Sequence, residues 1–139
     1  MLKFVGIICA VLFYSTACSA NSLFPLLAEG KWELHPDRKD DVSTFSCDDE
    51  PLIITIDLEN MRYVSTREGY REEASILEIG NGLFWIRYDD EARLDDNGEP
   101  VEWAWIADGD DQFYWARRDW PSGSGTNRRR RCPPPAATS

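Results

Sequence analysis

The sequence predicts an all-β protein, an antiparallel meander of about eight strands that curls into a small barrel. Apolar and polar residues alternate with a period of two over short runs, as expected for strands with one buried face. Turn-forming residues separate these runs at roughly the 8–12-residue spacing of all-β folds. No stretch shows convincing helical periodicity, which leaves a β architecture as the prediction.

The centre of the predicted sheet runs from residue 74 to residue 106. It contains three strands at residues 74–79, 83–88 and 101–106. Asn81-Gly82 joins the first two, and the pair is a strong hairpin signal because Asn and Gly best tolerate positive φ at both turn positions. An acidic loop that ends in Asp96-Asn97-Gly98 leads to the third strand.

The remaining strands are expected on both sides of this centre. The segment 52–57 is the clearest, because it is rich in β-branched residues and too short for a typical buried helix. Residues 67–73 are interpreted as a charged connection, and residues 23–27 as a lead-in or a single turn. The five outer strands are expected at residues 30–34, 52–57, 61–66, 113–118 and 128–132.

Alternation also predicts which side chains share a face. Phe84, Ile86 and Tyr88 are expected to point to one side of their strand. Trp103 and Trp105 share a face of the next strand. About six inward aromatic side chains, each contributing roughly 1.5–3 kcal/mol on burial, are expected to form the core.

Charge and composition exclude several function classes. The chain has 139 residues and a formal net charge of −10, which disfavours nucleic acid and anionic surfaces as partners and favours a basic protein or a cationic ligand, or simply solubility. His35 is the one histidine, so chemistry that needs two imidazoles is excluded. No cofactor is predicted.

The N-terminus predicts export. Residues 1–20 combine Lys3 with an apolar run of about 11 residues, where a membrane-spanning helix needs roughly 20, and then small residues. Two cleavage sites are compatible with this signal, one before Asn21 and one before Cys18. The predicted barrel domain then covers residues 21–132, and residues 133–139 are predicted to be a disordered tail.

Ser15-Thr16-Ala17-Cys18 resembles the lipobox of bacterial lipoproteins. That resemblance implies that Cys18 becomes the lipidated first residue of the mature chain and that the protein is anchored to a membrane. Ser19 after the cysteine implies sorting to the outer membrane, on its periplasmic side.

Cys47 and Cys132 are predicted to form a disulfide. Cys9 leaves with the signal and Cys18 is lipidated or removed, so an even pair remains in an oxidising compartment. The bridge would close a loop of about 85 residues and contribute up to roughly 4.5 kcal/mol in the chain-entropy model.

Gly30-Lys31-Trp32 at the head of the meander resembles the Gly-x-Trp signature of lipocalin and calycin barrels. The resemblance implies that Trp32 closes one barrel end and packs against a late arginine, either Arg117 or Arg118. It also implies a pocket for a small apolar ligand, although so many tryptophans could equally fill the barrel. The candidate ligand-binding residues are Trp32, Trp85, Trp103, Trp105, Trp115 and Arg117.

Three further patterns have simpler interpretations. The acidic loops at residues 89–99 and 108–111 could offer calcium ligands, but their spacing does not match an EF-hand, and solvated hairpin loops are expected instead. No pair of carboxylates is placed across a cleft for glycosidase chemistry, so no catalytic or metal residues are predicted. Arg128–Arg131 is expected to pair with the protein's own acidic loops, to contact anionic lipid, or to protect an exposed sheet edge.

The sequence therefore predicts a non-catalytic periplasmic binding module with a lipid anchor. The alternative is an acidic interaction or inhibitor module against a basic envelope enzyme such as lysozyme, with residues 89–99 as its contact loop.

Overall fold

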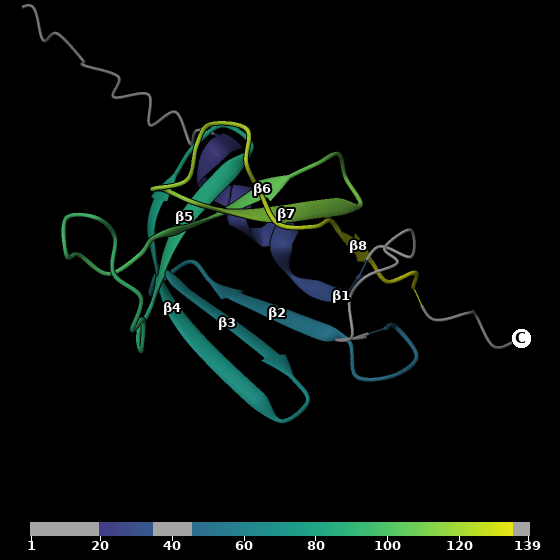
Figure 1. The fold of residues 1–139 in the computed structure, drawn as a ribbon. Helices are drawn as coiled ribbons and strands as arrows, with labels where there is room; N and C mark the ends of the chain where they lie inside the picture. Colours follow the sequence, from purple (N-terminus) through teal and green to yellow (C-terminus); the bar gives the residue numbers. More distant parts are fainter. Residues whose placement is uncertain (1–19, 35–45, 135–139) are drawn as a thin grey trace, which may run out of the picture.

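The computed structural model describes residues 20–34 and 46–134, and within them eight strands form a closed antiparallel barrel (Figure 1). Each strand pairs with the next along the chain, and the last pairs with the first. The predicted all-β meander is thus confirmed. The strands are β1 (Gly30–Leu34), β2 (Leu52–Asp57), β3 (Arg62–Arg67), β4 (Tyr70–Ile79), β5 (Leu83–Tyr88), β6 (Trp103–Ala107), β7 (Gln112–Arg117) and β8 (Arg129–Arg131).

The β3–β4 hairpin is longer than the sequence analysis predicted. Residues 67–73 were expected to be a connection, but β4 begins at Tyr70, which pairs with Arg67. Glu68 and Gly69 form a two-residue turn in which both φ angles are positive, at 50° and 76°. The sequence does not reveal this turn, because its first position is a glutamate, whereas Gly, Asn and Asp are the residues that commonly adopt a positive φ.

The Asn81-Gly82 hairpin is present, and its two strands end at residue 79 and begin at residue 83 as predicted. Ile79 pairs with Phe84, and the amide of Gly80 donates to the carbonyl of Leu83 at 2.9 Å. Gly82 has a φ of 78°, whereas Asn81 has an ordinary negative φ. The expectation of positive φ at both positions was therefore wrong: three residues, 80–82, connect β4 to β5, and among them Gly82 alone has a positive φ.

One end of the barrel is filled by aromatic side chains and covered by η1, a 3-10 helix over Ala20–Ala28. The ring of Phe24 contacts those of Phe84 and Trp105, with centroids 6.3 and 5.9 Å apart. Trp32 meets Phe113 edge to face at 4.7 Å. We call this the closed end. Six aromatic side chains are buried, as predicted: Trp32, Tyr63, Phe84, Trp105, Phe113 and Trp115.

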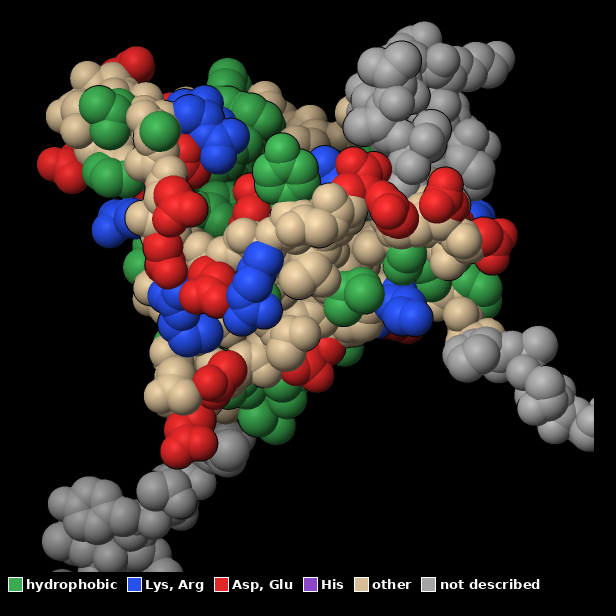
Figure 2. All heavy atoms as spheres, turned by 90° about the horizontal axis from the view of Figure 1, so that it is seen from below, with side chains coloured by type: hydrophobic (Ala, Val, Ile, Leu, Met, Phe, Trp, Pro, Cys, Tyr) green, Lys and Arg blue, Asp and Glu red, His purple; other side chains and the backbone are tan. Residues whose placement is uncertain are grey.

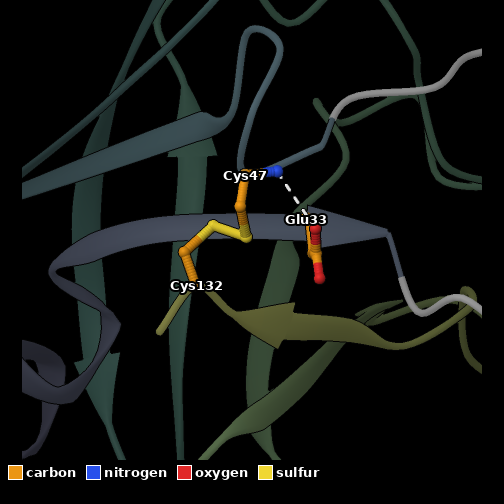
Figure 3. Close-up of side chains that lie close together, drawn as sticks. All are labelled: Glu33, Cys47 and Cys132. Carbon is orange, nitrogen blue, oxygen red and sulfur yellow. Dashed lines mark hydrogen bonds between the residues drawn. A yellow bond between two sulfur atoms is a disulfide. The ribbon is translucent and has the colours of Figure 1, made fainter. Parts of the chain in front are cut away.

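Cys47 and Cys132 form the predicted disulfide, which joins the segment before β2 to the residue after β8 (Figure 3). Their Cα atoms are 5.5 Å apart. The backbone amide of Cys47 donates to a carboxylate oxygen of Glu33 at 3.0 Å, so β1 is tied to the same corner. The bridge therefore lies where the barrel closes.

Some sequence predictions concern residues outside the described ranges. These are the export signal up to residue 19, the cleavage site before Cys18 and its lipidation, the loop histidine His35 and most of the C-terminal tail. Within residues 20–34 and 46–134, no helix is long and apolar enough to cross a membrane.

Candidate functional site

The end of the barrel opposite η1 is hollow, with a cavity of about 460 Å³. Its lining residues continue the inward faces of the strands. Tyr63 and Ser65 are buried on β3, and Tyr88 lies on the same face of β5 as buried Phe84 and Ile86. The cavity therefore lies inside the barrel wall. The barrel is filled at its closed end and hollow at this open end.

Aromatic side chains form much of the cavity wall. Trp103 and Trp115 line it from β6 and β7, while Tyr63, Tyr70 and Tyr88 line it from β3, β4 and β5. Burial raises the pKa of Tyr63, although hydrogen bonds with Ser65 and Tyr88 partly offset this. Burial also raises the pKa of Tyr88 well above its ordinary value. Both phenols are consequently neutral at physiological pH and act as hydrogen-bonding groups.

Four charged side chains line the same cavity: Arg67, Glu72, Arg93 and Arg129. Arg93 comes from the loop between β5 and β6, and its guanidinium lies 5.0 Å from the ring centroid of Trp103. Glu91 positions it by accepting two hydrogen bonds from its side chain, at 2.6 and 3.0 Å. Glu91 also accepts the Trp103 indole N–H at 3.0 Å, so loop and cavity wall form one network.

Of the six predicted ligand-binding residues, the structure brings Trp103 and Trp115 to the cavity. Trp32 and Trp105 are buried in the closed-end core, at 0% and 1% exposure. The two remaining candidates, Trp85 and Arg117, do not line the cavity. Trp85 alternates with buried neighbours on β5, and the guanidinium of Arg118 lies 3.9 Å from its ring centroid.

Arg117, the sixth candidate, lies beside the cavity without lining it. Its side chain donates to Asp119, with nitrogen–oxygen distances of 2.9 and 2.7 Å. Its guanidinium is 6.0 Å from the Trp103 ring centroid and 5.8 Å from that of Trp120. Arg117 therefore packs against Trp103, which lines the cavity, without lining the cavity itself.

The arginine that packs against Trp32 is Arg131, and not Arg117 or Arg118 as the sequence analysis expected. The guanidinium lies 4.2 Å from the Trp32 ring centroid and donates to the backbone carbonyls of Leu27 and Glu29. Register explains the choice, because Trp32 and Arg131 are direct partners across β1 and β8. Gly30 has a φ of 125°, and a Cβ there would lie 3.2 Å from this guanidinium.

The arginine run at residues 128–131 is engaged with its own barrel. Arg128 pairs with Asp108 at 2.6 Å, and Arg130 pairs with Glu33. The interpretation as an exposed sheet edge was wrong, because β8 pairs with β1 and β7 and the closed barrel leaves it no free side. Figure 2 shows basic and acidic side chains intermingled on one face of the molecule.

Metal-ligating side chains come together at one place among residues 20–34 and 46–134, where Glu33, Cys47 and Cys132 lie within 4.8 Å of one another. Figure 3 shows that the two sulfurs are joined in the disulfide, so they are not thiolate ligands. Within the described residues, no three carboxylates of the acidic loops lie within 4.8 Å of one another.

Sequence reasoning missed the polar lining of the cavity. A signal was present, because inward positions change from apolar to polar along β5 and β3: Phe84 and Ile86 precede Tyr88, and Tyr63 precedes Ser65 and Arg67. The same trend runs backwards along β4, from Ile76 and Ala74 to Glu72. Because this change from apolar to polar inward residues occurs on several strands, it predicts that one end of the barrel interior is polar.

Comparison of the chain with protein-family models, with curated protein sequences and with solved structures found no significant match. The barrel and its cavity are therefore interpreted from their own geometry.

Proposed function

We propose that this chain is an exported, lipid-anchored periplasmic binding module with a lipocalin-like barrel, which holds a small ligand at its open end without catalysing a reaction. The observation that carries the proposal is the cavity of about 460 Å³, enclosed by the same faces that form the core. Pockets for small molecules commonly measure roughly 300–1,000 Å³ and combine aromatic walls with a few polar groups.

Two further features support this function. Trp32 and Arg131 close the other end of the barrel in the manner that the lipocalin resemblance implies, so the hollow end has a rigid base. The neutral tyrosines favour ligand hydrogen bonding over nucleophilic chemistry. The disulfide fits an oxidising compartment, and the signal at residues 1–20 supplies the export and the anchor.

Filling the cavity tests the proposal. Ser65 is 3% exposed and points into the barrel beside the cavity, whereas Thr66 is the next residue and faces outward. The native protein should co-purify from periplasm with a small molecule that native mass spectrometry detects. Ser65→Leu should abolish binding of this molecule, whereas Thr66→Leu should retain it. Near-ultraviolet circular dichroism confirms that both variants fold. A native protein that carries no ligand, or one whose ligand survives Ser65→Leu, would contradict the proposal.

A second candidate is the acidic interaction module. The loop at residues 89–99 stands away from the barrel (Figure 1), and Asp90, Asp96 and Glu99 are exposed on it. Such a loop favours association with a basic enzyme through charge complementarity. Capture on immobilised lysozyme should then fall steeply with salt and be lost when these three residues become Asn, Asn and Gln. Unchanged capture by the triple variant would exclude this loop as the contact.

A further inference from the structure

The charge of the open-end cavity is opposite to that of the protein. Three arginines and one glutamate line it, although the whole chain has a formal net charge of −10. Lys and Arg total 15 against 25 Asp and Glu, so a random surface sample would be acidic. The cavity thus concentrates cationic groups in a molecule that is otherwise rich in carboxylates.

Two of these arginines are held in place by hydrogen bonds to neighbouring side chains. Arg93 stacks over Trp103 and is held there by Glu91, whose side chain is only 1% exposed. Arg129 donates to the hydroxyl of Thr126 at 2.6 Å, and this hydroxyl in turn accepts the backbone amide of Trp115 at 2.9 Å. Two cationic groups are therefore fixed beside the two tryptophans before any ligand arrives.

We propose that the cavity selects an anionic ligand with a planar aromatic body. This inference rests on the proposed ligand-binding function and specifies its substrate class. The ring lies against Trp103 and Trp115, and a carboxylate, sulfonate or phosphate group meets the guanidinium groups of Arg67 and Arg129.

Physical chemistry favours this class over a neutral apolar ligand. Guanidinium groups form paired, charge-assisted hydrogen bonds with oxyanions, and these are about twice as strong as neutral ones. A hydrocarbon ligand would offer these guanidinium groups no acceptor. The aromatic walls reward a flat ring through offset or edge contacts. A cationic ligand would meet three like charges and one opposite charge.

Two fluorescent probes separate the possibilities. Anilinonaphthalene sulfonate carries a sulfonate on an aromatic body, whereas phenylnaphthylamine has a closely similar body without charge. Binding of each to the purified full-length mature protein is followed by energy transfer from tryptophan. We expect the sulfonate to bind roughly tenfold more tightly and its affinity to weaken with added salt, because charge-assisted contacts to arginine supply the difference.

Three substitutions assign that preference to the cavity. Arg67→Gln should weaken sulfonate binding about three- to tenfold and leave phenylnaphthylamine unchanged, because one cationic contact is removed. Glu72→Gln should strengthen sulfonate binding, because it removes the one carboxylate of the lining. Arg71→Gln is the matched control: Arg71 is exposed on the outer face of β4 and pairs with Glu73 at 2.8 Å. It should change neither affinity.

The outcomes distinguish this inference from the function on which it rests. Equal affinities for the two probes, or tighter binding of phenylnaphthylamine, would overturn the anion preference and leave small-ligand binding in place. Equal effects of Arg67→Gln and Arg71→Gln would also overturn it. If neither probe binds the natively folded protein, both the binding function and the anion preference fail.

Discussion

At the scale of single residues, Glu91 is the acidic side chain on which the cavity rim depends. Its side chain is 1% exposed, although it lies in a loop rich in solvated carboxylates. Burial by itself would raise the pKa of Glu91, but hydrogen bonds from Arg93 and Trp103 and the charge of Arg93 lower it overall. The native state therefore prefers the ionised carboxylate.

Glu91→Gln should destabilise the protein at neutral pH by about 1–2 kcal/mol, because hydrogen bonds to a charged acceptor are weakened. The native pKa is lowered from 4.5, so the stabilisation is complete above the unfolded value and disappears as pH falls through the native one. Urea unfolding should therefore show the stabilities of the two proteins converging as the pH falls below 4.5.

Glu99→Gln, at an exposed position of the same loop, provides the control for this measurement. It should leave stability nearly unchanged at each pH. A difference between Glu91→Gln and the native protein that stays constant through the acid range would show that the Glu91 charge does not stabilise the fold.

At the scale of elements, β8 and η1 close the barrel together. β8 has three residues and pairs with β1 through all of them, but with β7 through only two. Thr126 extends the contact with β7, since its amide donates to the Trp115 carbonyl at 2.7 Å. Arg131 then donates to the backbone carbonyl of Leu27 in η1 and to that of Glu29, which follows η1, while it covers the Trp32 ring.

Arg131→Ala should lower the free energy of unfolding by about 2 kcal/mol, since it removes a cation–π contact and two hydrogen bonds to backbone carbonyls. Arg131→Lys should recover part of this loss, because an ammonium group keeps the charge but not the planar stack. Chemical denaturation measures both. Arg71→Ala, at an exposed ion pair, should cost no more than about 0.5 kcal/mol. Equal losses of stability from Arg71→Ala and Arg131→Ala would contradict a stabilising role for the contacts of Arg131.

At the scale of the whole molecule, the disulfide secures the closure that the short β8 strand leaves weak. Cys132 follows β8 directly, and its amide donates to the Lys31 carbonyl at 2.8 Å. Cys47 is tied to β1 through Glu33, which also pairs with Arg130. The bridge, the ion pair and the strand pairing thus converge on one corner of the barrel.

Replacing both cysteines by serine should destabilise the protein by about 2–4 kcal/mol, because the unfolded chain loses a cross-link 85 residues apart in sequence. Hydrogen exchange should increase most at the amides of Arg131 and Cys132, because local opening of β8 becomes easier. Labelling of free thiols in the unreduced native protein should find neither Cys47 nor Cys132. Uniform exchange changes across the barrel would contradict a local role for the bridge.

Much of the fold could be predicted because it depends on neighbours in sequence. The alternation of Phe84, Ile86 and Tyr88 and the hairpin signal at Asn81-Gly82 are local, and a meander joins each strand to the next one. The error at residues 67–73 arose where a turn used Glu68 in a conformation that glutamate seldom adopts.

The cavity could be predicted only in part. Trp103 and Trp115 were proposed as ligand-binding residues and do line it, but Trp32 and Trp105, proposed on equal grounds, fill the closed end. Position along the barrel axis separates the two pairs. That position depends on strand stagger, which alternation of residues within one strand does not encode.

The sequence by itself determined the strands, their order and the cysteine pair, because periodicity, turn chemistry and cysteine count are local or additive properties. Only the tertiary structure decided that Arg131 covers Trp32 and that one end of the barrel stays hollow. Both depend on the register with which β8 meets β1, residues about a hundred positions apart in the chain, and on how side-chain volume is distributed along the barrel.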